Sequence, residues 1–577
     1  MRWLLKPKPD GTQVKLLAKQ LNITDSLAYL LVQRGICTFE DAEVFFRPSL
    51  THLHYPFLMK DMDLAVQRIE KAIENGENIM VFGDYDVDGT TSVALVSSYL
   101  KTMTNQIATY IPDRYEEGYG VSYQGIDFAD DNNISLIIAL DCGIKAVDKV
   151  AYAKGKGIDF IICDHHTPGD KIPEAEAILN PKQADCNYPY KELCGCGIGF
   201  KLVQALATKS GQQVEDLMPY LDLVATAVGA DIVPITGENR TLMYFGLQEL
   251  NRHPRVGFKV LLQQLKKKVY DVNEVVFVLA PRINAAGRMK HGQHAVALLS
   301  ETDEKIAEVL GQEIETYNLD RRQADQGITQ EALQLIEASG EQNRFSTVVY
   351  QAHWHKGVIG IVASRLTETY YRPTVVFTKS GDKLAASARS VSGFDLYQAL
   401  EACTDCLEQF GGHKFAAGLT LKESQFESFK NRFEKVVSES IEEWQRTPTL
   451  NIDMELQLQE IDAKFYRILK QLSPFGPENM TPVFVARGVR DSGNGKTVGK
   501  AQDHLRLSLT QNGSTPIVAI GFGLGNKLDI IQSGKPFDAV FSIDENEWNG
   551  SVSLQLKLRD IQESVKYRVK TESGQSV

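Results

Sequence analysis

The chain has 577 residues, more than a single hydrophobic core usually supports, so we expect several domains. Hydrophobic residues make up 43% of it and charged residues 24%, the balance of an ordinary globular protein. The net charge of −12 is not that of a simple nucleic-acid-coating protein, although an acidic enzyme can gather its Lys and Arg in one channel. No apolar run is long enough to span a bilayer and the first residues lack a signal-peptide core, which favours a cytoplasmic address.

The first half of the chain alternates helices with strands rich in Ile and Val. Residues 1–50 are expected to form short helices of an N-terminal accessory segment, and residues 51–300 to form a catalytic domain. Strands are predicted over 78–86, 106–112, 135–141 and 159–166, with helices over 64–76, 90–103 and 146–157. This alternation is typical of βαβ units and predicts an α/β fold around a parallel sheet.

The second half of the chain changes character twice. A charge-rich helical stretch over 301–340 is predicted to connect the first domain to a second α/β domain at 341–445. From 446 to 577 several short strands are separated by turn residues. That pattern predicts a small β-barrel, of the OB type that binds nucleic acid.

Acidic and imidazole side chains follow four apolar runs of the chain. They are Asp84, Asp86 and Asp88, then Asp141, then Asp164, His165 and His166, and finally Asp231. Because the carboxyl ends of parallel strands share one edge of a sheet, these groups are expected to converge there. Packed carboxylates repel one another unless a cation neutralises them, and oxygen ligands with imidazole suit Mn²⁺ or Mg²⁺. The number of candidate ligands favours two ions over one.

Each of these motifs has a simpler interpretation when taken alone. An Asp after a strand is often a helix N-cap, Asp231 could pair with a nearby Arg, and His165 and His166 could be surface residues. All four motifs in this order are hard to produce by chance. The metal site is therefore the favoured interpretation.

The stretches VFGDYDVDGTTS, ALDCGI and CDHH, with the later Asp231, resemble the four motifs of the DHH phosphoesterase superfamily. In the second domain, Gly411, Gly412 and His413 resemble the GGH signature that accompanies DHH in its nuclease and phosphatase branch. Three further stretches resemble the RecJ-type exonucleases of this superfamily. They are PDRYEEGYG with Arg114 and Tyr119, APRINAAGRM with Arg282, Asn284 and Arg288, and WHKGVIGIVASRL followed by SARSVSGFDL with Ser387 and Arg389.

The resemblance implies a metal-dependent 5′→3′ exonuclease that degrades single-stranded DNA to 5′-mononucleotides in recombination and repair, with Mn²⁺ or Mg²⁺ as cofactor. It makes Asp86, Asp88, Asp141, His165 and Asp231 the metal ligands. It gives Asp84, Asp164, His166 and His413 catalytic or supporting roles, Asp84 being a possible further ligand. Substrate contacts are expected from the guanidinium, polar and glycine residues of the same motifs: Arg114, Tyr119, Arg282, Asn284, Arg288, Ser387, Arg389, Gly411 and Gly412.

Two other functions stay open at this point. One is a phosphodiesterase for short oligonucleotides or cyclic dinucleotides, and the other is a non-catalytic DNA-binding scaffold. The predicted barrel favours a polymeric substrate over a small one, and the intact motifs disfavour the scaffold. The family also implies a single-strand-binding protein and repair or recombination enzymes as partners.

The cysteines and the glycine-rich stretches carry no predicted chemistry. Neither Cys194 and Cys196 nor Cys403 and Cys406 have a second pair at zinc-site spacing, and the latter two fall in a helical pattern. GCGIGF (195–200) and GNGKT (493–497) are predicted to be turns. No ATP site is expected, because Arg490 stands where a phosphate loop needs Gly.

Overall fold

The computed structural model describes residues 1–265, 267–548 and 551–564. The chain forms two compact units: Ser49–Pro448, and Met1–Pro48 together with Thr449–Val577. The predicted accessory segment therefore belongs to the same unit as the C-terminal region. Within the described residues, no helix combines the length and apolarity needed to cross a membrane.

The first unit contains the predicted parallel sheet, with strand order β3-β2-β4-β5-β6. Its strands are β2 (Asn78–Gly83), β3 (Ile107–Tyr110), β4 (Ile134–Leu140), β5 (Asp159–Cys163) and β6 (Ala177–Leu179). Every neighbouring pair is parallel. The strands β2, β4, β5 and β6 are mostly buried, as expected of apolar runs in a parallel sheet with both faces covered, and β3 at the edge is half-buried.

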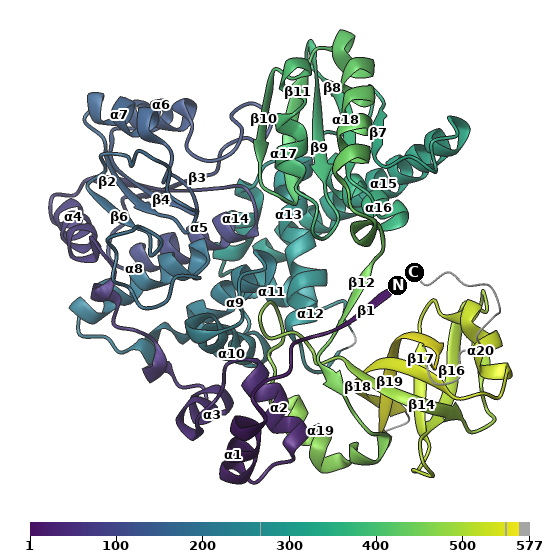
Figure 1. The fold of residues 1–577 in the computed structure, drawn as a ribbon. Coiled ribbons are helices and arrows are strands. Elements are labelled where there is room, and N and C mark those ends of the chain that lie inside the picture. Colours follow the sequence, from purple (N-terminus) through teal and green to yellow (C-terminus); the bar gives the residue numbers. More distant parts are fainter. Residues whose placement is uncertain (266, 549–550, 565–577) are drawn as a thin grey trace. The chain divides into compact units, whose positions relative to one another are not determined.

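Helices cover both faces of this sheet (Figure 1). One face packs against α4 (Met62–Glu74), α5 (Val87–Leu100) and α8 (Gly195–Lys209), and the other against α6 (Tyr123–Asp131) and α7 (Val147–Gly155). The turn predicted at GCGIGF is wrong. Those glycines open α8, whose N-cap is Cys194, so the segment is the first turn of a buried helix.

A helical layer follows the sheet along the chain. It consists of α9 (Leu221–Ala230), α10 (Gly237–Arg252), α11 (Val256–Leu262), α12 (Val272–Glu274), a π-helical turn (Val275–Leu279), α13 (Ala280–Met289) and α14 (Gln293–Ser300). The predicted connecting helix is confirmed as α15 (Glu304–Ala338), which begins at the N-cap Asp303.

The second α/β domain has a mixed sheet of order β10-β11-β9-β8-β7. Its strands are β7 (Thr347–Tyr350), β8 (Thr374–Ser380), β9 (Lys383–Arg389), β10 (Gln409–Gly412) and β11 (Ala416–Leu421), and its helices are α16 (Ile359–Tyr370), α17 (Leu396–Glu401) and α18 (Phe426–Ser440). Only β7 and β8 pair in parallel. The helix predicted across the Cys403 and Cys406 pair ends at Glu401, and both cysteines are buried beyond it.

The other unit contains the predicted barrel. It is built from β14 (Phe484–Asp491), β16 (His504–Thr510), β17 (Ile517–Gly521), β18 (Phe537–Trp548) and β19 (Ser551–Glu563), with β13 (Met454–Glu455), β15 (Lys496–Val498), α19 (Ala463–Lys470) and α20 (Leu528–Gln532) around them. The sheet closes on itself because β14 pairs with both β18 and β16.

The N-terminal helices share the core of this unit. They are α1 (Gly11–Leu21), α2 (Asp25–Gln33) and α3 (Phe39–Phe46). Leu27 and Leu31 lie in one apolar cluster with Phe465 and Phe484. In addition, β1 (Arg2–Leu5) pairs in parallel with β12 (Thr449–Ile452). The turn predicted at GNGKT is confirmed only for its first three residues, because Lys496 and Thr497 begin β15. The Gly493 and Gly495 amides donate to the Asp491 carboxylate.

Candidate metal centre

The predicted ligands leave the sheet and the adjoining helices at neighbouring points. Asp84 follows β2, Asp141 follows β4, and Asp164, His165 and His166 follow β5. Asp86 is the N-cap of α5, Asp88 lies in the first turn of that helix, and Asp231 is the C-cap of α9. Ligand atoms of Asp141, His165 and His166 lie within 4.8 Å of one another, as do those of Asp88, His165 and Asp231. The convergence predicted for the strand ends is therefore present.

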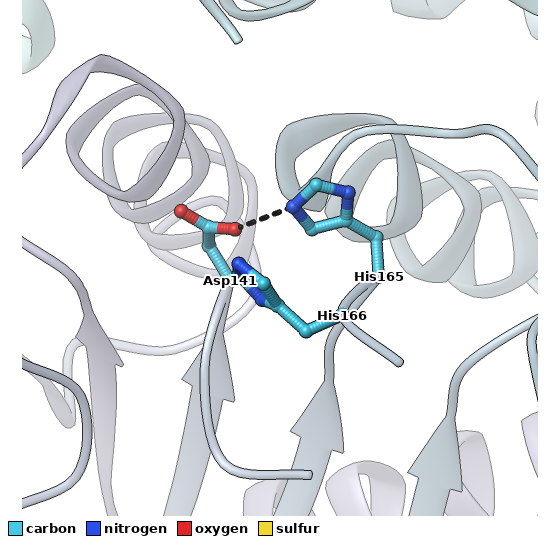
Figure 2. Close-up of side chains that lie close together, drawn as sticks. All are labelled: Asp141, His165 and His166. Carbon is cyan, nitrogen blue, oxygen red and sulfur yellow. Dashed lines mark ion pairs between the residues drawn. The ribbon is translucent and has the colours of Figure 1, made fainter. Parts of the chain in front are cut away.

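His165 stands at the middle of this cluster. Its Nε2 lies 3.2 Å from Asp141 Oδ1, 3.6 Å from Asp231 Oδ2 and 3.9 Å from Asp88 Oδ2. Figure 2 shows the Asp141 carboxylate and the His165 ring facing each other from adjacent strand ends. Despite this proximity, Asp141 Oδ1 and Asp231 Oδ2 are buried and accept no hydrogen bond.

Buried polar atoms without partners are costly, and here several of them face one point. Asp84 Oδ2 is a further buried carboxylate oxygen without a hydrogen bond. An oxygen-rich set with one imidazole matches the ligands that Mn²⁺ and Mg²⁺ use in proteins. The residues present therefore fit a divalent metal centre.

The electrostatics of the cluster agree with this fit. Burial, reinforced by neighbouring carboxylates, raises the pKa of Asp88 to about 7 and that of Asp231 to about 9. The same causes raise the pKa of Asp141 well above its ordinary value. Burial and the neighbouring His166 lower the pKa of His165 to about 3, so its imidazole is neutral and keeps a lone pair for a metal. A bound cation would offset the repulsion between these carboxylates, which is one cause of their raised pKa values.

Asp164 and His166 form a separate supporting pair. Asp164 Oδ1 lies 2.7 Å from His166 Nδ1, and Asp164 Oδ2 accepts the Ile144 amide at 2.9 Å. Burial alone would raise the pKa of Asp164, but its hydrogen bond and attraction to His166 hold it below the ordinary value. The same pair raises the pKa of His166 against the effect of burial. His166 Nε2 in turn lies 3.1 Å from the Tyr119 hydroxyl, which joins Tyr119 to the pair.

Guanidinium groups of the first unit gather beside this cluster. Burial, together with repulsion from Arg114, Arg321 and Arg389, lowers the pKa of Arg288 to about 10. Burial and Arg114 likewise lower the pKa of Arg389. Arg114 lies with its Cζ 4.6 Å from the centre of the Tyr85 ring. Such a group of mutually repelling cations favours an anion with several charges.

Two elements hold this arginine group in place. On β9, Arg389 Nη1 donates to Ser387 Oγ at 3.0 Å. On α13, Arg288 Nη1 donates to the Gly357 carbonyl at 3.0 Å, and the Tyr115 hydroxyl donates to the Arg288 carbonyl. The arginines of the first domain and Arg389 of the second are thus brought together, as the predicted substrate contacts require.

The other predicted substrate residues lie in different surroundings. Arg282 Nε donates to Glu315 Oε2 at 2.7 Å, which ties α13 to α15, and Asn284 is half-buried on α13. Gly411 and Gly412 end β10, and His413 is exposed in the turn that follows, where its amide donates to the Ala416 carbonyl at 2.8 Å. A Cβ at Gly412, where φ is +151°, would lie 2.4 Å from that carbonyl oxygen. The substrate roles of these residues stay predictions.

Sequence reasoning missed four residues beside the cluster: Tyr85, Asn180, Lys182 and Arg321. Asn180 is fully buried and its Nδ2 donates to the His166 carbonyl at 2.9 Å, so it holds the DHH loop. The positive charge of Lys182 acts on both His165 and Asp231. Tyr85 could have been found from its place between Asp84 and Asp86, whereas Arg321 carries no local signal within the charge-rich α15.

Comparison with known proteins gives three family matches. The DHH family N-terminal domain matches residues 78–228, the DHHA1 domain matches 343–439, and the RecJ OB domain matches 452–560. The single-stranded-DNA-specific exonuclease RecJ of Bacillus subtilis is 38% identical over 97% of this chain and 70% of its own length. The Escherichia coli protein of the same name is 33% identical over 87% of this chain and 90% of its own length.

Solved structures show the same relationship. RecJ from Thermus thermophilus in complex with Mn²⁺ matches with a TM-score of 0.82 and 26% identity, over 97% of this chain and 79% of that one. An exonuclease RecJ bound to manganese matches with a TM-score of 0.60 and 31% identity, over 68% of this chain and 96% of that one.

Proposed function

The chain belongs to the RecJ family of single-stranded-DNA-specific exonucleases, and we propose that it hydrolyses single-stranded DNA at a centre for Mn²⁺ or Mg²⁺. The observation that carries the proposal is the cluster of Asp88, Asp141, Asp231 and His165, in which buried oxygens of Asp141 and Asp231 face the imidazole without hydrogen bonds. With Asp86 and Asp84 beside them, these residues would hold the metal, and we propose two ions.

Bound ions would supply positive charge at the phosphate and activate a water for in-line displacement. The chain's own residues orient the reacting groups. Asp164 raises the pKa of His166 and so favours its imidazolium form, in which both ring nitrogens donate, one to Asp164 and one to the Tyr119 hydroxyl. Tyr119 then has its own proton free to donate, and its side chain is 55% exposed. This relay can hold a phosphate oxygen beside the metal centre.

The direction of degradation is a finer part of the proposal. We propose that Arg114, Arg288, Ser387 and Arg389 hold the 5′-terminal phosphate and so make the enzyme a 5′→3′ exonuclease that releases 5′-mononucleotides. This proposal is supported by the closeness of the arginines, which come from two domains of one unit and lie near Asp86. His413, Gly411 and Gly412 are proposed to approach the phosphate backbone from β10. Because the proposed substrate is single-stranded DNA, we propose that the enzyme acts in recombination and repair. We also propose a single-strand-binding protein as its partner and the cytoplasm as its location.

A single assay tests the reaction and its alternatives. The protein is incubated with Mn²⁺ and a 5′-phosphorylated single strand, its duplex, a dinucleotide or a cyclic dinucleotide. We expect mononucleotides from the single strand and little from the duplex. Consumption of only the dinucleotides would establish the small-substrate phosphodiesterase instead, and binding without hydrolysis would establish the scaffold.

A further inference from the structure

The first turn of α8 contacts the metal cluster directly. The Gly195 amide donates to Asp88 Oδ2 at 2.6 Å, and the Cys196 amide donates to Asp88 Oδ1 at 2.7 Å. Asp88 is only 2% exposed, and both of its oxygens are fixed by these two bonds. The amides come from a segment far along the chain, so the orientation of Asp88 depends on where α8 begins.

Gly195 also determines how close α8 comes to Asp141. A Cβ at position 195 would lie 2.6 Å from Asp141 Cβ and 2.7 Å from Asp141 Oδ1, so no larger residue fits without moving that carboxylate. Asp141 Oδ1 is itself buried without a hydrogen bond, and it is the oxygen that faces His165. Two metal-binding carboxylates, from α5 and from the end of β4, therefore depend on the same residue.

The start of α8 is fixed by Cys194. Its Sγ accepts the Gly197 amide at 3.4 Å, and the residue is fully buried as the helix N-cap. Free amides and the helix dipole make a helix N-terminus favourable for a carboxylate. With Gly197 bound to the cap, the amides of Gly195 and Cys196 are the ones directed at Asp88.

We propose that Gly195 and Cys194 are positioning residues of the metal centre: they place the first turn of α8 so that its amides orient Asp88 and leave room for Asp141. The inference rests on the proposed metal centre and deepens it. Residues that orient metal ligands typically change metal affinity or activity roughly 10–100-fold when replaced. The GCGIGF segment would then act through the ligands without contacting the metal or the DNA.

The test compares Gly195→Ala with Gly199→Ala on the same helix. A Cβ at 199 would contact Val96 and Leu140 at 3.2 and 3.5 Å and no carboxylate, so it reports the cost of a methyl group in this buried helix. Mn²⁺ binding without DNA is measured by electron paramagnetic resonance, together with KM and kcat. We expect Gly195→Ala to bind Mn²⁺ roughly tenfold more weakly and to lose kcat, with KM for DNA nearly unchanged, and Gly199→Ala to resemble wild type.

A second pair of variants covers the case in which Gly195→Ala does not fold. Cys194→Ala removes the N-cap acceptor and should weaken Mn²⁺ binding, whereas Cys194→Ser, which keeps an acceptor, should restore it. Equal Mn²⁺ affinity in wild type and Cys194→Ala, or in wild type and folded Gly195→Ala, would overturn the inference while leaving the metal centre intact. A wild-type protein that binds no Mn²⁺ would overturn the proposed centre, and the inference with it.

Discussion

Asp164 Oδ1 lies 2.7 Å from His166 Nδ1, so the carboxylate of the DHH triplet is hydrogen-bonded to the second histidine of the same triplet. The pKa values of the two adjacent histidines are shifted in opposite directions. His166 has a raised pKa because Asp164 stabilises its proton against the effect of burial. His165, buried without such a partner, has a pKa of about 3 and stays neutral. Neighbouring residues of one motif are thereby suited to two roles, cation and metal ligand.

The first prediction concerns this pair. Asp164→Asn removes the negative charge that raises the pKa of His166, so that pKa should fall toward or below 6.5. Activity should drop roughly 10–100-fold, as is typical when a supporting group is lost. Nuclear magnetic resonance titration of the His166 ring measures the shift. Tyr119→Phe is the matched control, because it removes the other partner of His166 without removing charge, and an unshifted His166 in Asp164→Asn would contradict the assignment.

The second prediction concerns the ligands. Asp88→Ala and Asp141→Ala each remove a carboxylate from the proposed centre, so activity in Mn²⁺ should fall by several orders of magnitude while DNA binding changes little. Because the metal-free cluster contains mutually repelling carboxylates, Asp141→Asn should also raise the melting temperature measured in EDTA and abolish the increase that Mn²⁺ produces in wild type. Near-normal nuclease activity in either alanine variant would show that the residue is not a ligand.

The third prediction is the pH dependence of the metal-free protein. An acid whose pKa is raised by folding contributes stability at low pH that is lost as pH rises through the folded value. The pKa values of Asp88 and Asp231 are about 7 and about 9. Ionisation of these two carboxyls should therefore lower the melting temperature in EDTA between pH 6 and 9. The raised pKa of His166 acts in the same direction.

Mn²⁺ binds the charged carboxylates, so it should flatten this slope and bind more tightly as pH rises. Asp231→Asn should flatten the slope without metal, since it removes the carboxyl whose pKa is about 9. Melting curves recorded across this range in EDTA and in Mn²⁺ give both slopes. A metal-free melting temperature that rises from pH 6 to 9 would contradict the predicted repulsion.

The sheet, and the clustering of acidic and imidazole groups at its edge, could be predicted from sequence because their signals are local. The strand Ile134–Leu140 is an almost continuous apolar run, since it is buried on both faces, and Asp141 stands at its end. The start of α8 could not be predicted in this way. Three glycines within five residues are typical of a turn, and what makes them helical is the Cys194 cap and the contact with Asp88 across the fold.

Long-range pairings escaped prediction for the same reason. Arg2–Leu5 is too short to be recognised as a strand, and it exists because Thr449–Ile452 pairs with it. The arginine group gathers residues from separate motifs and from α15, so Arg321 has no sequence signal. The helix expected across Cys403 ends at Glu401, because helical periodicity does not determine where the chain leaves the helix to form the next strand, β10.

The fourth prediction concerns the unit that contains the barrel. Arg506, Lys557 and Arg559 on its strands could track a DNA backbone. Because residues 1–48 share a core with the barrel, the appropriate truncation removes both and leaves residues 49–448. In this fragment, KM for long single strands should rise more than KM for very short ones. Equal losses on both would indicate that the unit serves folding.

The last prediction concerns the end at which degradation starts. A terminal phosphomonoester carries more charge than an internal diester, so the arginine group should favour a 5′-phosphate over a 5′-hydroxyl. Each charge-assisted hydrogen bond contributes about 1.5–3 kcal/mol, enough for a preference of roughly tenfold or more. Arg114→Ala and Arg389→Ala should shrink this preference while Mn²⁺ binding is unchanged. Arg432→Ala is the matched control, because that arginine lies on α18 and donates to the Ala402 carbonyl.

The measurement is the ratio of kcat/KM for otherwise identical single strands that differ only at the 5′ end. Ser387→Ala tests the group further, since it removes the hydroxyl that orients Arg389 without removing charge, and it should reduce the ratio less than Arg389→Ala. Arg114 also lies over the Tyr85 ring, so Tyr85→Leu should weaken the preference by freeing the guanidinium. If Arg114→Ala and Arg389→Ala keep the wild-type ratio, these arginines do not sense the end, and their positive charge serves the DNA backbone instead.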